Sequence, residues 1–130
     1  MPDSSSPAAT VADKVAAIKS RLTIPAFSAP MFLVSGPDLV IAACKAGVIG
    51  SFPTMNARPI SALEEWFERI TKELAEAEKN NPGTTAPWAA NIICHSTSKR
   101  FDKDFALLQQ YKPEIVITAL GSPRRVVEKV

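Results

Sequence analysis

The sequence has few of the residues from which small proteins build disulfide-linked or metal-held structures. Only two of its 130 residues are cysteines, Cys44 and Cys94, and its only histidine is His95. Two cysteines so far apart in the chain match neither a disulfide framework nor a zinc site. We therefore expect a reducing compartment, and predict a cytoplasmic protein without a bound metal.

Long apolar runs and a strong net charge are also lacking. No run approaches the roughly 20 apolar residues needed to cross a bilayer, and the first residues lack the basic and apolar regions of a signal peptide. The net charge is +2, and the lysines and arginines do not cluster with aromatic residues. These absences predict a soluble protein with no membrane partner and no nucleic-acid partner.

The sequence does contain enough apolar residues for one folded domain, because 46% of its residues are hydrophobic. Residues 1–9 are the exception: they are mainly serine, proline and alanine, which predicts a disordered tail. Apolar residues then recur at helical spacing over residues 11–22 and predict a short amphipathic helix that covers one end of a sheet.

Four apolar segments follow, and each precedes a helical pattern. We expect strands over residues 24–31, 48–52, 87–93 and 114–120, with helices over 36–46, 61–80, 101–111 and from 123 onward. Ser35 is expected to cap the first of these helices, Ser61 to open the second with a capping box, and Gly47 to end the first in a left-handed conformation. Strands that alternate with helices pair in parallel through right-handed crossovers.

Two α/β architectures fit this order of elements. One is an open, doubly wound sheet, which would be complete at this length. The other is a (β/α)₈ TIM barrel, typically of about 250 residues, of which these four strand-helix units would form the N-terminal half. Periodicity alone does not choose between them. In both, binding groups gather at the carboxyl ends of the strands.

Three segments near the start of the chain resemble the opening of the nitronate monooxygenases, once called 2-nitropropane dioxygenases. These are Ile24–Met31, Val34–Leu39 and Ala46–Ser51, and the similarity continues at Asn91 and Thr118. The family consists of FMN-dependent barrel enzymes that oxidise alkyl nitronates with dioxygen. Flavin-dependent enoyl reductases begin in a similar way. The resemblance implies that residues 10–130 are the N-terminal half of a TIM barrel.

The resemblance also implies a set of cofactor-binding residues. Ala29, Pro30, Met31 and Phe32 would lie against the flavin ring, with the small Ala29 permitting close approach. Without the resemblance, Pro30 would simply end a strand and Met31 would fill the core.

Two further polar residues are candidates for flavin binding. Asn91 lies in an apolar strand and needs a partner, because an unpaired buried amide costs about 1–3 kcal/mol. That partner is either the flavin or its ribityl chain, or a backbone carbonyl of the next strand. Thr118 has the same two alternatives.

Groups needed for a complete reaction are missing from the sequence. The base implied by the family is a histidine from the second half of the barrel, so we expect His95 to be a solvated surface group and Cys94 an inert thiol. FMN barrels hold the phosphate after strands seven and eight, and no glycine-rich phosphate loop is present. No catalytic residue is therefore assigned.

The sequence thus predicts a chain that supplies the flavin-ring side of a nitronate-oxidising site, with a nitronate and dioxygen as substrates. The alternatives are an enoyl reductase-like flavoprotein that uses NAD(P)H, or a truncated chain without catalytic activity. Half a barrel leaves two strand edges open, so we also expect self-association through these edges.

Overall fold

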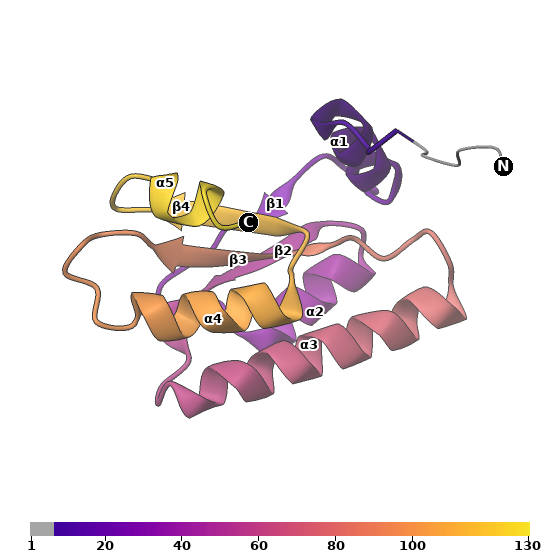
Figure 1. Ribbon diagram of the computed structural model, residues 1–130. Coiled ribbons are helices and arrows are strands. Elements are labelled where there is room, and N and C mark those ends of the chain that lie inside the picture. The colour runs from indigo at the N-terminus through magenta and orange to yellow at the C-terminus, as the bar shows by residue number, and fades with distance from the viewer. Residues whose placement is uncertain (1–6) are drawn as a thin grey trace, which may run out of the picture.

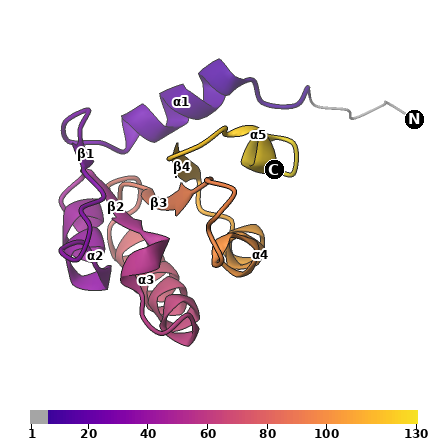
Figure 2. The same cartoon turned by 90° about the vertical axis from the view of Figure 1, so that its left-hand side faces the viewer.

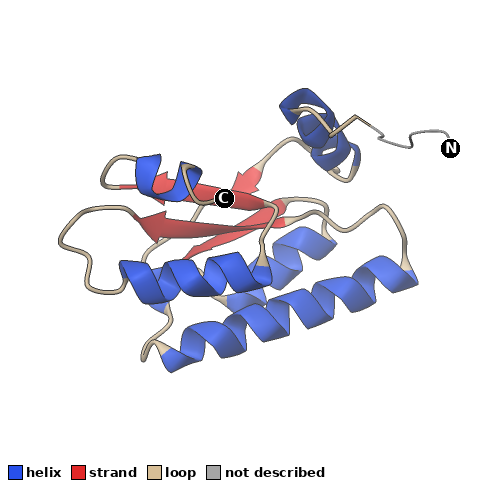
Figure 3. Ribbon diagram, viewed as in Figure 1, coloured by secondary structure: helices blue, strands red, loops and turns tan. Residues whose placement is uncertain are grey.

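The computed structural model describes residues 7–130. Strands and helices alternate along the chain (Figures 1 and 3). Their bounds are α1 Val11–Ser20, β1 Phe27–Ser28, α2 Pro37–Lys45, β2 Ile49–Pro53, the 3₁₀ turn η1 Thr54–Asn56, α3 Ser61–Asn80, β3 Trp88–Ile93, α4 Phe101–Tyr111, β4 Ile115–Ala119 and α5 Arg124–Val127. Each strand is followed by a helix, as the sequence predicts.

The four strands form one parallel sheet in the order β1-β2-β3-β4. Viewed along the strands, α2, α3 and α4 lie side by side on one face of this sheet (Figure 2). A doubly wound sheet would reverse its strand order and carry helices on both faces. The structure is therefore an α/β fold with a singly wound parallel sheet, which is consistent with half a barrel.

The side chains of the strands alternate between two faces. Phe52, Ala90 and Ile92 belong to the buried core that the sheet shares with α2, α3 and α4, and their side of the sheet is called the helix face. Because successive residues of a strand point to opposite sides, Ser51, Ala89 and Asn91 lie on the other side, called the inner face. The core therefore lies between the helix face and one layer of helices.

The first strand is shorter than predicted. The sequence suggests a strand over residues 24–31, but only Phe27 and Ser28 pair with β2. Pro25 and Pro30 flank this pair, and proline has no N–H to donate to a neighbouring strand. The other three strands match their predicted ranges to within a residue at each end.

Two of the predicted helix caps are wrong. The N-cap of α2 is Gly36 rather than Ser35, and the N-cap of α3 is Ile60, so no capping box forms at Ser61. The predicted left-handed Gly47 is confirmed: its φ is +82°, and it follows Ala46, the C-cap of α2. A Cβ at Gly47 would also overlap the side chain of Thr23, so glycine is required there for two reasons.

Helix α1 lies beyond the amino ends of the strands, which agrees with its predicted position (Figure 1). A capping box formed by Thr10 and Asp13 begins it, yet none of its residues is buried. Arg21 connects its end to the sheet: Nε donates to the Thr85 carbonyl at 3.0 Å, and Nη1 lies 2.8 Å from Glu114 Oε1. Of the predicted tail, residues 1–6 lie outside the described part, and residues 7–9 are exposed without regular structure.

Candidate functional site at the carboxyl edge of the sheet

The loop between β1 and α2 exposes four consecutive large apolar side chains. Their exposed fractions are 42% for Met31, 51% for Phe32, 72% for Leu33 and 67% for Val34. The loop leaves the carboxyl end of β1, where parallel α/β proteins bind their ligands. A contiguous apolar surface of this kind is typical of a binding site rather than of an ordinary loop.

Ser35 holds the start of this loop in place. Its side chain is 2% exposed, and its hydroxyl accepts a hydrogen bond from the Met31 N–H at 2.9 Å while donating to the Ala29 carbonyl at 3.2 Å. The serine therefore braces the Ala29-Pro30-Met31 segment instead of capping α2. Sequence reasoning identified Ser35 but assigned it the wrong partner.

Asn56 fixes the same loop from the turn that follows β2. Its Nδ2 donates to the carbonyls of Met31 and Ser35 at 3.0 and 2.9 Å, and its Oδ1 accepts from the Leu33 N–H at 3.0 Å. These three bonds hold Leu33 at a positive φ of 64°, which a leucine rarely adopts. Two polar side chains, Ser35 and Asn56, therefore hold the backbone of the exposed apolar loop in one conformation. Sequence reasoning missed Asn56, because nothing near it in the chain signals this role.

Phe32 has a cationic neighbour on the same loop cluster. The Arg58 guanidinium carbon lies 5.7 Å from the centre of the Phe32 ring. At this distance a guanidinium is attracted to the face of an aromatic ring. The Phe32 side chain is therefore held at the protein surface with half of its area still exposed.

Asn91 lies at the carboxyl edge on the inner face. Its Nδ2 donates to the Ile117 carbonyl at 3.0 Å, so the donor is satisfied by the next strand, as one of the two sequence alternatives proposed. No described residue donates to Oδ1, and the residue is 9% exposed. The amide oxygen therefore remains able to accept a hydrogen bond from a ligand.

Asn91 and the β1–α2 loop both lie toward the carboxyl edge of the sheet. Phe27 pairs with Ile49, and Asn91 pairs with Pro53, four residues further along β2. The pairing of β1 ends at Ser28, and the chain then continues past this edge into the β1–α2 loop. Strand β2 lies between β1 and β3, so the loop and Asn91 belong to the same carboxyl edge without direct contact.

Thr118 is not brought together with these residues. It pairs with Ile92, a buried residue of the helix face, whereas Asn91 pairs with Ile117. Because paired residues of neighbouring strands point to the same side, the Thr118 side chain lies on the helix face. Only the backbone of Thr118 can therefore reach a ligand on the inner face.

A buried charged cluster supports the loop that follows β2. Asp104 is 3% exposed; its Oδ2 accepts from Thr54 Oγ1 at 2.8 Å and its Oδ1 from Arg100 Nη2 at 3.2 Å. Arg100 also donates to the Ala57 carbonyl at 2.7 Å. Every charge in the cluster has a partner, which is the condition for a stable buried ion pair. The cluster thus positions the loop and offers no free acid or base.

His95 and the two cysteines take no part in this site. His95 is exposed, as expected, and its Nδ1 accepts from the Thr97 N–H at 3.2 Å. Cys94 and Cys44 are both buried. Desolvation raises the pKa of the Cys44 thiol to about 11, against a smaller opposing effect of the Gly50 N–H. A buried thiol of this kind is a poor nucleophile.

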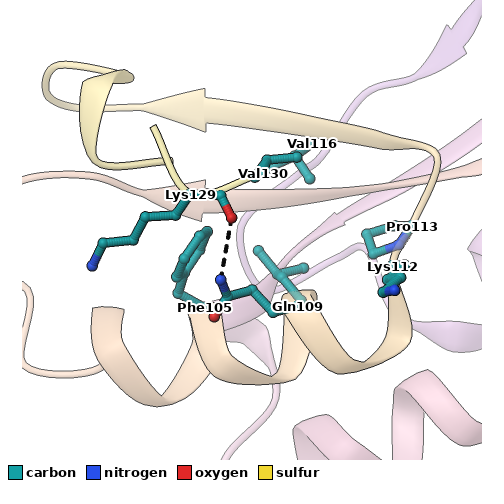
Figure 4. Close-up of a pocket in the computed structure, with 8 residues that line it drawn as sticks. Phe105, Gln109, Lys112, Pro113, Val116, Lys129 and Val130 are labelled. Atoms are coloured by element: carbon teal, nitrogen blue, oxygen red, sulfur yellow. Dashed lines mark hydrogen bonds between the residues drawn. The ribbon is translucent and has the colours of Figure 1, made fainter. Parts of the chain in front are cut away.

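The structure also has an apolar groove of about 440 Å³ between α4, β4 and the last residues of the chain. Phe105, Leu108 and Gln109 of α4 line it together with Val116 and the last two residues of the chain (Figure 4). Gln109 Nε2 donates to the Lys129 carbonyl at 3.3 Å across one end. The groove lies on the helix face, and the charged side chains at its border, Lys112 and Lys129, are exposed to solvent, so we do not assign the site there.

Comparisons with protein-family models, with curated proteins and with solved structures found no match for this chain. Within residues 7–130, no helix is both long enough and apolar enough to cross a membrane. In the same residues no group of three or more histidine, cysteine, aspartate or glutamate side chains is placed to hold a metal ion. The function must therefore be argued from the geometry of the carboxyl edge.

Proposed function

We propose that this chain forms the flavin-ring side of an FMN-dependent, nitronate monooxygenase-like oxidoreductase built on a TIM barrel. The observation that carries the proposal is the braced apolar loop, residues 29–34, at the carboxyl edge of a singly wound parallel sheet. FMN barrels bind their cofactor at this edge. The resemblance of residues 24–51 to the nitronate monooxygenases supports the same assignment.

The residues of the edge fit the ring of a flavin. A flavin ring needs an apolar surface and a few fixed polar groups, which is how cofactor pockets are generally built. Met31 and Phe32 supply exposed apolar surface, Ala29 is small and exposed, and Pro30 stiffens the segment between them. Asn91 Oδ1 supplies an acceptor that no described residue uses.

The chain's own residues would bind and orient the ring rather than react with the substrate. The cofactor, when bound, supplies the electron transfer between nitronate and dioxygen. Ser35 and Asn56 would keep the loop from collapsing when the ring leaves, because their bonds do not depend on a ligand. The apolar loop would exclude water from one side of the ring.

The proposal assigns the remaining tasks to strands five to eight of a complete barrel. The base and the phosphate loops have no counterpart at the carboxyl edge described above. Thr118 keeps a proposed role only through its backbone, because its side chain lies on the helix face. We further propose that the protein works in the cytoplasm on a small nitronate.

Activity assays on a completed barrel test this function. The chain would be coexpressed with strands five to eight of a nitronate monooxygenase and supplied with FMN. We expect oxygen uptake with propionate 3-nitronate and no oxidation of NADH. Oxidation of NADH coupled to reduction of an enoyl substrate would identify the enoyl reductase-like alternative. Flavin binding without either reaction would indicate a catalytically silent chain.

A further inference from the structure

We propose that two copies of this chain close into one eight-stranded barrel, with β4 of each copy paired in parallel to β1 of the other. This inference concerns assembly and does not depend on flavin binding. It starts from the two ends of the sheet, since β1 and β4 each have a neighbour on one side only within the described residues.

The β4 edge is suited to pairing. Its sequence is Ile-Val-Ile-Thr-Ala, without charge, proline or glycine, and all five residues are only half-buried. Soluble proteins normally protect such an edge with charges, prolines or a covering segment. Neither Phe27 nor Ser28 of β1 is charged, so no like-charge repulsion opposes contact between the two edges.

The inner face gives a second reason for association. Phe27 is 52% exposed on this face, while Ile115 and Ile117 are half-buried. Barrel strands are normally covered on both faces, with side chains from all strands filling the interior. In this sheet the inner-face residues of the central strands, Ser51, Ala89 and Asn91, are already buried, so the apolar surface left for a partner lies near β1 and β4 at the two edges.

The total surface is large for the mass of the chain. Its accessible surface is 8190 Å², whereas a compact monomer of 14.0 kDa exposes about 6,700 Å². Helix α1, none of whose residues is buried, and the exposed residues 7–10 account for part of this difference of about 1,500 Å², so only the remainder can belong to the open sheet.

A second copy is the occupant that satisfies both edges and the inner face together. A two-fold axis along the centre of the curved sheet places β4 beside β1 of the partner twice, which gives eight parallel strands and no free edge. Antiparallel pairing of two β4 strands would leave both β1 edges and both inner faces exposed. The closed arrangement is therefore the one that the strand order and the exposed surface favour.

Sedimentation equilibrium of the purified 130-residue chain without FMN is the first test. We expect a single species with about twice the mass of 14.0 kDa. A monomer, or a ladder of larger species, would overturn closure into a two-copy barrel. This measurement uses the unmodified chain, so it does not depend on whether any variant folds.

Disulfide cross-linking then identifies which edges meet. Phe27→Cys would be combined in turn with Ile115→Cys, Ile117→Cys or Ala119→Cys. All four positions lie on the inner face. If β4 of one copy pairs with β1 of the other, the two cysteines of one combination come within disulfide-bonding distance. We expect one combination to give a covalent dimer while each single variant and the native chain do not, since Cys44 and Cys94 are buried. A dimer cross-linked by Ile117→Cys alone would show β4–β4 contact and contradict the proposal.

Discussion

The Asn91 side-chain amide donates a hydrogen bond to the Ile117 backbone carbonyl, with 3.0 Å between Nδ2 and the oxygen. The bond connects β3 to β4 on the inner face, close to the carboxyl edge. It leaves Oδ1 without a described donor. Asn91 can thus stabilise the sheet through its nitrogen and meet a ligand through its oxygen, and the two roles are separable by mutation.

Replacing Asn91 with alanine should lower the free energy of unfolding by about 1–3 kcal/mol. The reason is that a side-chain bond at a buried polar site is lost and the inner face gains a small void. Urea unfolding followed by circular dichroism measures the change. Asn91→Asp is the matched variant: it keeps the shape and the acceptor but, when ionised, has no proton for the Ile117 carbonyl, so it should be destabilised as well. Unchanged stability in both variants would show that the bond is not formed in solution.

Ser35→Ala should loosen the apolar loop and destabilise the chain by about 1–3 kcal/mol, because the Met31 N–H and the Ala29 carbonyl both lose a buried partner. Amide hydrogen exchange should show the Met31 N–H losing its protection. Ser20→Ala is the control, because the exposed Ser20 hydroxyl donates only within its own helix, to the Ala17 carbonyl. We expect that change to remain within about 0.5 kcal/mol. Equal effects of the two substitutions would refute a bracing role for Ser35.

Stability should fall as the pH rises from about 9 to about 11, because of Cys44. Burial raises the pKa of its thiol from 9.0 to about 11, so the unfolded chain releases this proton at a lower pH than the folded chain. Below the unfolded value both states are protonated and the contribution is constant; above it, deprotonation favours unfolding. Burial likewise raises the pKa of Tyr111 from 10.0 to about 12, which extends the same trend to higher pH.

Cys44→Ala isolates the thiol's share of this pH dependence. The variant should be less stable at neutral pH because it leaves a cavity beside the core. Its urea midpoint should nevertheless decline less steeply than that of the native chain between about pH 9 and pH 11. Parallel declines in the two proteins would assign the alkaline loss to other groups.

The long helices and the alternation of strands with helices could be predicted from the sequence. Helices 61–80 and 101–111 were correct at both ends because their apolar residues recur at helical spacing over several turns. Strand order and the single layer of helices could not be predicted, because periodicity describes each element separately. Of the two architectures left open, the strand order excludes the doubly wound sheet and is consistent with the half barrel that the resemblance implied.

The support of the candidate site was largely beyond sequence reasoning. Asn56 bonds to Met31 and Ser35, which lie more than 20 positions away in the sequence. Ser35 matches the pattern of a helix N-cap, but its hydroxyl bonds to Met31 in the loop instead of to the helix. Thr118 was grouped with Asn91 because both are polar residues in apolar strands, but a shift of one residue in register moves a side chain to the opposite face. Local patterns do not encode contacts of this kind.

Flavin retention tests the central claim most directly, because the claim is that the β1–α2 loop contacts the ring. The chain alone should purify without stoichiometric flavin, since no phosphate loop is assigned in it. The decisive sample is the chain refolded with strands five to eight of a nitronate monooxygenase, saturated with FMN and desalted, and its visible absorption spectrum is the measurement. We predict bound-flavin bands for the native chain and for Ala29→Ser, and their loss in Ala29→Leu, whose bulk would block close approach of the ring. Because the Ala29 side chain is exposed, we expect both variants to fold, which circular dichroism of each sample checks. Equal retention by Ala29→Leu, or no retention by any of the three, would contradict the account.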